Sequence, residues 1–191
     1  MFENIVKLYR AYGGIWAILS SYYFWIAFLC ALVSYKSAIN KSWIELNIGI
    51  MPSLTGFTIA SFAIVFAILG PDLVKTLLSR SGKGSSPITV VAASLGHAIM
   101  IQVFSIIVAL LSRTADLGEL LYIFDKILKC FGIEFDLLRF FTNFVALPFS
   151  FLGLILMYYG VFLVLAAILS IFRMQLIVDG VNKRKSDSTA E

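Results

Sequence analysis

The stretch Gly49–Gly70, GIMPSLTGFTIASFAIVFAILG, decides the fold because its small residues recur at gaps of three and four. That spacing places them on one face of an α-helix of about 3.6 residues per turn. Most of the other residues are large and apolar. In lipid, small side chains let helix backbones approach while bulky ones face acyl chains. The stretch therefore predicts a membrane helix that packs through one seam: Gly49, Ser53, Gly56, Ala60, Ala63, Ala67 and Gly70.

The composition also indicates lipid as the solvent, since 60% of the 191 residues are hydrophobic and only 14% are charged. A typical soluble domain has about a quarter of its residues charged. Four runs contain no Asp, Glu, Lys or Arg: 11–35, 46–71, 84–112 and 140–172. Each exceeds the ~20 residues that a helix needs to cross a hydrocarbon core of ~30 Å. We therefore expect one all-α membrane domain, residues 1–191, with a polytopic four-transmembrane-helix bundle.

Aromatic residues at the ends of the runs and prolines near helix starts set the boundaries of the spans. The predicted spans are about 15–35, 50–70, 87–111 and 149–172. A second small-residue seam repeats every seven residues in the fourth span and includes Gly153, Gly160 and Ala167. Four helices in one chain offer few places for several such seams, so the sequence predicts a homo-oligomer.

The connection between the third and fourth spans predicts an amphipathic helix at about 116–131, on the outer side of the membrane. Asp116 and Glu119 form a capping pattern, and apolar residues then recur at threes and fours. This helix could lie flat on the membrane, cap the bundle or bind a partner. Residues 179–191 form a polar tail.

Lysine and arginine are denser on the side that four spans would give to both termini than in the long outer loop. The positive-inside rule then predicts that both termini lie in the cytoplasm, with the chain in the cell (inner) membrane. The net charge of +4 fits this topology and anionic lipid better than direct nucleic-acid binding. The basic residues that could form a surface for a cytoplasmic protein partner are Lys75, Arg80, Lys83, Lys183, Arg184 and Lys185.

The third span is the most polar and carries the candidate polar intramembrane site, His97, Gln102 and Ser105. His97 could serve as a proton relay or line a pore, or its neutral ring could bond a neighbouring helix. Gln102 could form a hydrophilic constriction in an oligomer, or it could hold helices together. Ser105 belongs to the same small and polar stripe as Gln102.

The sequence contains no pattern that supports catalysis, metal binding or cofactor binding. His97 is the single histidine, and its span holds no carboxylate to complete a metal site or a catalytic triad. A phosphate loop at Gly82-Lys83 would need Gly in place of Leu77, and Ser or Thr in place of Gly84. We expect no enzyme and no cofactor. The two cysteines, Cys30 and Cys130, could be bridged or stay unlinked.

In layout the chain resembles the short four-span bacterial membrane proteins of anti-phage defence, such as the membrane subunit of the Kiwa system. The resemblance covers the whole chain and rests on four spans, cytoplasmic ends and the run Pro-Ser-Leu-Thr-Gly-Phe at residues 52–57. It carries over no functional residue. It implies a sensor or effector that works with a cytoplasmic partner.

These observations predict a non-catalytic integral membrane protein that acts as an oligomeric sensor, anchor or effector subunit. Its expected partners are the lipid bilayer, further copies of the chain and a cytoplasmic protein. The polar third span favours an alternative, a channel or transporter subunit for protons or a small solute.

Overall fold

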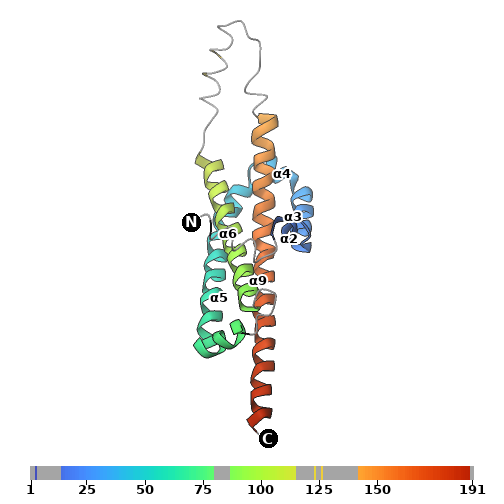
Figure 1. The fold of residues 1–191 in the computed structure, drawn as a ribbon. Helices are drawn as coiled ribbons and strands as arrows, with labels where there is room; N and C mark the ends of the chain where they lie inside the picture. Colours follow the sequence, from blue (N-terminus) through green and yellow to red (C-terminus); the bar gives the residue numbers. More distant parts are fainter. Residues whose placement is uncertain are drawn as a thin grey trace.

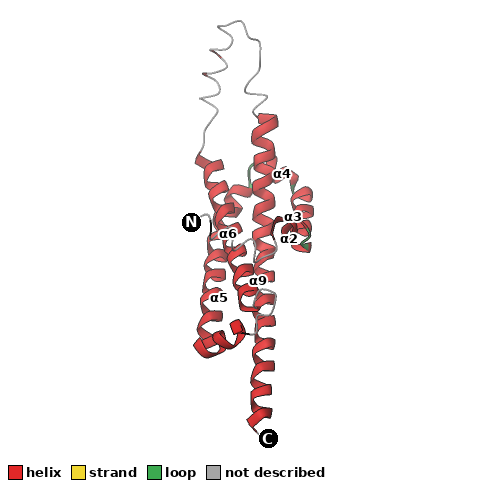
Figure 2. Cartoon of the chain, viewed as in Figure 1, coloured by secondary structure: helices red, strands yellow, loops and turns green. Residues whose placement is uncertain are grey.

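The computed structural model describes residues 14–79, 87–114 and 142–189, together with the single positions 3, 123 and 126. The side chains within these ranges are described as far as Ala67 in the first, from Ile88 in the second, and from Phe144 to Gly180 in the third. The described residues are helical apart from short turns and contain no strand, as predicted (Figure 2).

The helices differ greatly in length, and the longest three form the body of the molecule (Figure 1). In chain order they are α2 (Gly14–Leu19), α3 (Tyr22–Val33), α4 (Tyr35–Ile39), α5 (Trp43–Ser79), α6 (Pro87–Thr114), the π-helical turn η1 (Thr142–Ala146) and α9 (Leu147–Thr189). In Figure 1, α5, α6 and α9 run side by side along the long axis, and α6 contacts both of the others.

Three segments of the described chain are long and apolar enough to cross a membrane: Trp43–Ala67, Ile88–Thr114 and Phe144–Gly180. They overlap the second, third and fourth predicted spans. This finding confirms the all-helical fold and three of the expected membrane segments, and it indicates a membrane protein. The second predicted span ends at residue 70, whereas α5 continues through Gly70-Pro71 to Ser79.

The first predicted span, 15–35, is divided in the structure into α2 and α3. Ser21 has an extended backbone with φ −74° and ψ 128°, which ends α2 and begins α3. The indole N–H of Trp25 donates to the Leu19 carbonyl at 2.8 Å and so satisfies a group that the break frees. α3 has 12 residues and is ~18 Å long, shorter than a ~30 Å hydrocarbon core. The described chain therefore shows three candidate spans where composition predicted four.

Trp43 joins the short helices to the long ones. Its indole ring is fully buried and lies against Gly153 of α9, where an added Cβ would stand 2.6 Å from Trp43 Cζ2. Trp43 Nε1 donates to Ser150 Oγ at 2.8 Å, and Ser150 Oγ donates to the Ala38 carbonyl at 2.7 Å. This chain of contacts fixes α4, α5 and α9 to one another at the end of the body where α5 begins.

The predicted outer helix at 116–131 and Cys130 lie outside the described residues, apart from the single positions 123 and 126. Cys30, on α3, is a half-buried free thiol. α9 continues as a helix into the predicted polar tail, as far as Thr189.

Candidate functional site

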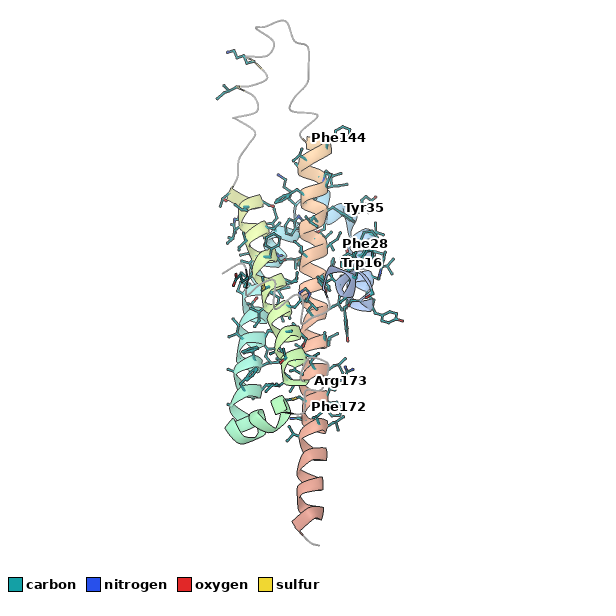
Figure 3. All side chains as sticks on the ribbon, in the orientation of Figure 1. Trp16, Phe28, Tyr35, Phe144, Phe172 and Arg173 are labelled. Atoms are coloured by element: carbon teal, nitrogen blue, oxygen red, sulfur yellow. The ribbon has the colours of Figure 1, made fainter. Side chains whose placement is uncertain are left out.

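A row of polar side chains is buried between the three long apolar helices. We call Asn47, His97, Gln102, Ser105 and Tyr159 the polar row; each is at most 2% exposed. The outer surface of the same helices is apolar: in Figure 3, Trp16, Phe144 and Phe172 project away from the body, and they are 81%, 69% and 57% exposed. The molecule is therefore polar at its centre and apolar outside, the arrangement expected of a protein surrounded by lipid.

The first level of the polar row joins α5 to α6. Asn47 Nδ2 donates to Ser105 Oγ at 2.6 Å, and both residues are fully buried. Asn47 lies one turn before Met51 on the inner face of α5. An amide and a hydroxyl that bond each other across two helices satisfy groups that lipid cannot, so this pair favours the contact between α5 and α6.

The second level joins α6 to α9 through Gln102 and Gly160. Gln102 Nε2 donates to the Gly160 carbonyl at 3.2 Å. A Cβ on Gly160 would lie 3.2 Å from Met51 Cε and 3.3 Å from Gln102 Cγ, closer than usual carbon contacts. The glycine therefore lets both side chains reach the backbone of α9, which is the role that the sequence assigned to the second seam.

The third level pairs His97 of α6 with Tyr159 of α9. His97 Nε2 and the Tyr159 hydroxyl are 3.0 Å apart, and the tautomer of the ring decides which atom donates. Tyr159 also packs edge-on against Phe24 of α3, with ring centroids 5.7 Å apart. His97 is thus part of the contact between three helices, and its ring is fully buried.

Beyond this level the polar contacts continue with hydroxyl groups. Ser94 Oγ lies 3.3 Å from Ser170 Oγ, and each serine also donates to a backbone carbonyl of its own helix. Thr55 and Thr58 donate to carbonyls four residues earlier in α5, at 2.8 and 2.9 Å. Polar groups therefore accompany the interface of the long helices over most of its length.

The structure brings all three predicted polar residues, His97, Gln102 and Ser105, to one buried interface of α6. The sequence pattern did not identify Asn47 and Tyr159 as their partners. Asn47 lies just outside the predicted span at 50–70, so its burial was not anticipated. The sequence feature that could have indicated its burial is its spacing of four residues from Met51. That spacing places both on one face of a helix that begins before residue 50.

The two predicted seams have different places in the structure. Gly153, Gly160 and Ala167 are buried in the contacts of α9 with α5 and α6. The α5 seam does not pack against the other helices that the structure describes: its members are exposed, namely Gly49, Ser53, Gly56, Ala60, Ala63 and Ala67. A Cβ added at Gly49 or Gly56 would meet nothing within 4 Å. The side-chain surroundings of Gly70 lie outside the described part.

The inner face of α5 carries polar residues in place of the predicted seam. Asn47, Thr55, Thr58 and Ser61 are buried against the other helices. This face is about 180° from the small-residue face at ~100° per residue. Both faces have helical spacing, and the polar one turns inward because its amide and hydroxyls need partners that lipid does not supply. The expectation that the small residues lock this chain's own helices is thereby corrected for α5.

The predicted partner surface cannot be assembled from the described side chains. The backbones of Lys75, Lys183, Arg184 and Lys185 belong to α5 and α9, while Arg80 and Lys83 lie outside the described residues. Among the described residues, no group of three His, Cys, Asp or Glu is placed to hold a metal ion. The polar row offers amide, hydroxyl and imidazole groups, which can hold helices together or move a proton between neighbours.

The fold defines the class of protein: an all-α chain with three helices able to cross a membrane and a polar interior. Comparison with family models, with curated proteins and with solved structures finds no significant match. Function is therefore inferred from the helices and the polar row themselves.

Proposed function

We propose that this chain is a non-catalytic integral membrane subunit that assembles with further copies of itself. Its role in the assembly is that of a sensor, anchor or effector that acts with a cytoplasmic protein partner. The resemblance to four-span proteins of bacterial anti-phage defence supplies the biological setting of the proposal, and the inner membrane is its location. The end of the body that carries the α5–α6 connection and the C-terminus faces the cytoplasm.

The observation that carries this proposal is the outward direction of the α5 seam. Six small residues from Gly49 to Ala67 form an exposed strip ~27 Å long, close to the depth of a hydrocarbon core. Lipid chains gain little from a strip without large side chains, whereas a second helix can approach its backbone closely. The interior contacts of the chain are made by other residues, so the strip remains available to a second copy.

Cysteine crosslinking in membranes tests this arrangement. In a background of Cys30→Ala and Cys130→Ser, we expect Ala60→Cys to form disulfide-linked dimers on mild oxidation. Phe57→Cys is the matched control, since Phe57 is 52% exposed at nearly the same depth but about 60° around the helix from Ala60. Equal crosslinking at both positions, or none at Ala60→Cys and at Gly56→Cys, would contradict an interface through the strip.

The partner side of the proposal rests on the basic residues of the sequence, of which Lys183, Arg184 and Lys185 are consecutive. Anionic surfaces of a cytoplasmic protein, or anionic lipid, are the chemistry that such residues attract. A partner that copurifies with the wild-type chain and not with the triple Glu variant at these positions would support this part of the proposal.

A second candidate function is a channel or transporter subunit for protons or a small solute. The polar row favours it, because amide, hydroxyl and imidazole groups follow one another through the interior of three apolar helices. In the described arrangement these side chains are closed off from solvent, with His97 and Gln102 both 0% exposed. Conduction would therefore require the helices to move, and we rank this function second.

A further inference from the structure

Two amide oxygens in the polar row accept no hydrogen bond. Asn47 Oδ1 and Gln102 Oε1 are buried without a partner within the described structure. The nitrogen of each amide is engaged, toward Ser105 Oγ and the Gly160 carbonyl respectively. Buried polar groups are normally paired, so an unpaired acceptor in the interior of a membrane protein calls for a further donor, of which a bound water is one.

The two oxygens belong to the first and second levels of the polar row, which are one helical turn apart on α6. Ser105, which Asn47 bonds, lies one turn from Gln102 on the same face of α6. Met51, one turn after Asn47, reaches the same glycine of α9 as Gln102, within 3.2 and 3.3 Å of the position of a Gly160 Cβ. Asn47, Gln102, Ser105 and Met51 therefore line one part of the interface between α5, α6 and α9, which we call the layer.

We propose that this layer binds one water molecule, held by Asn47 Oδ1, Gln102 Oε1 and Ser105 Oγ. Water has two hydrogens to donate, one to each unpaired amide oxygen. It can also accept the hydroxyl proton of Ser105, because Ser105 Oγ acts as the acceptor toward Asn47 Nδ2. Three hydrogen bonds are the usual number for a buried water, and both amide oxygens of the layer are then paired.

A cation fits the same layer less well. No charge in the layer balances it: the acid closest in sequence, Glu45, is exposed and pairs with Arg113 at 3.6 Å. The amide N–H groups of Asn47 and Gln102 also point into the same interface and would repel a positive ion. Water, which both donates and accepts, matches the mixed donors and acceptors.

Met51 controls the space for this water. Protein atoms cover both amide oxygens, so a side chain must turn aside for a water to reach them. Gln102 is held by its hydrogen bond to the Gly160 carbonyl, whereas the thioether chain of Met51 has three rotatable bonds and adapts to irregular gaps. The water thus lies beside a sulfur atom, which makes it detectable.

The site lies near the middle of the membrane segment. Gln102 is ~16 Å from Arg113 along α6, and Gly160 is ~20 Å from Arg173 along α9, at ~1.5 Å per residue. Arg113 and Arg173 are exposed charged residues near opposite ends of the body. The inference does not depend on the assembly through the α5 strip, so either proposal can fail without the other.

Radiolytic footprinting of the full chain in lipid nanodiscs tests the site. A short X-ray pulse converts a bound water into hydroxyl radical, which oxidises a neighbouring methionine sulfur, and heavy-oxygen water identifies the source of the added atom. We expect Met51, 0% exposed, to be oxidised several-fold faster than Met174, which is 3% exposed among apolar residues. Equal rates at Met51 and Met174 would overturn the proposal.

Variants that remove the ligands of the water make the test specific. Asn47→Leu, Gln102→Leu and Ser105→Ala should each lower the oxidation of Met51 toward the rate of Met174. A faster oxidation of Met174 would reveal a variant that has lost its packing. In that case the test rests on Ser105→Ala, the smallest of the three changes. Fast oxidation of Met51 that all three variants leave unchanged would also overturn the assignment.

Discussion

At the scale of single residues, glycine has opposite roles on the two sides of the bundle. Side chains from neighbouring helices fill the space beside Gly153 and Gly160, whereas nothing lies within 4 Å of a Cβ added at Gly49 or Gly56. The sequence spacing gives all four the same appearance, because periodicity reports a shared face and not what that face contacts. The direction of a seam is set by the polar residues on the opposite face of its helix.

Substitution of Gly153 tests the close contact with Trp43. In Gly153→Ala the new Cβ would stand 2.6 Å from Cζ2 of a ring that is buried and hydrogen-bonded to Ser150. We expect a loss of ~1–3 kcal/mol in the free energy of unfolding, as for other overpacked cores. Gly160→Ala should cost less, because the nearest atom, Met51 Cε at 3.2 Å, ends a flexible side chain.

Gly180→Ala is the matched control, since nothing lies within 4 Å of its added methyl group and it lies outside the α5 strip. Its helix propensity should leave the chain unchanged or more stable by up to ~1 kcal/mol. Unfolding in mixed micelles, followed by circular dichroism, measures all three variants. A Gly153→Ala protein as stable as Gly180→Ala would show that α5 and α9 are further apart at Trp43 than described.

At the scale of elements, the three long helices were predictable and the first span was not. Length and hydropathy identify α5, α6 and α9, because each contains a long apolar stretch. The same measures treat 15–35 as one stretch, although Ser20-Ser21 interrupts it. Serine side chains compete for backbone hydrogen bonds, and Ser20 Oγ donates to the Ala17 carbonyl at 3.3 Å. Two small polar residues barely change the mean hydropathy of a stretch as long as 15–35.

The position of the N-terminal segment follows from the length of α3. If residues 14–39 do not cross the membrane, Glu3 and Lys41 lie on the same side. We expect Glu3→Cys and Lys41→Cys, in the cysteine-free background, to react with an impermeant maleimide from the same side of intact cells. Labelling from opposite sides would show that the predicted first span, 15–35, crosses the membrane, and would support a cytoplasmic N-terminus. A cysteine placed at Arg173 serves as the control for the other face.

At the scale of the whole molecule, charged residues mark the depth of the membrane. The exposed pair Glu45–Arg113 lies at one end, and exposed Arg173 lies toward the other. Residues 150–172 of α9 lie between these levels and measure ~34 Å, close to a hydrocarbon core. The candidate polar residues were also predictable, whereas their partners were not, because Asn47 and Tyr159 come from other helices.

The closed interior of the whole bundle gives a prediction for the second candidate function. In liposomes, the resting chain should pass neither protons nor small ions above the level of empty vesicles, since the polar row has no exposed member. Proton flux that His97→Ala or Gln102→Leu abolishes would reverse the ranking of the two functions. Flux that neither variant changes would place a conduction path outside the polar row. Fluorescence of a trapped pH indicator measures the rate.

α9 is a single helix of 43 residues, ~64 Å long, about twice the thickness of a hydrocarbon core. Below the level of α5 and α6 in Figure 1, it continues alone toward the C-terminus. An unbroken helix resists bending, so any tilt imposed on it inside the bilayer becomes a larger sideways displacement at its far end. A change of tilt at the contact between Trp43 and Gly153 would therefore move the C-terminal end of α9 further than the rest of the helix.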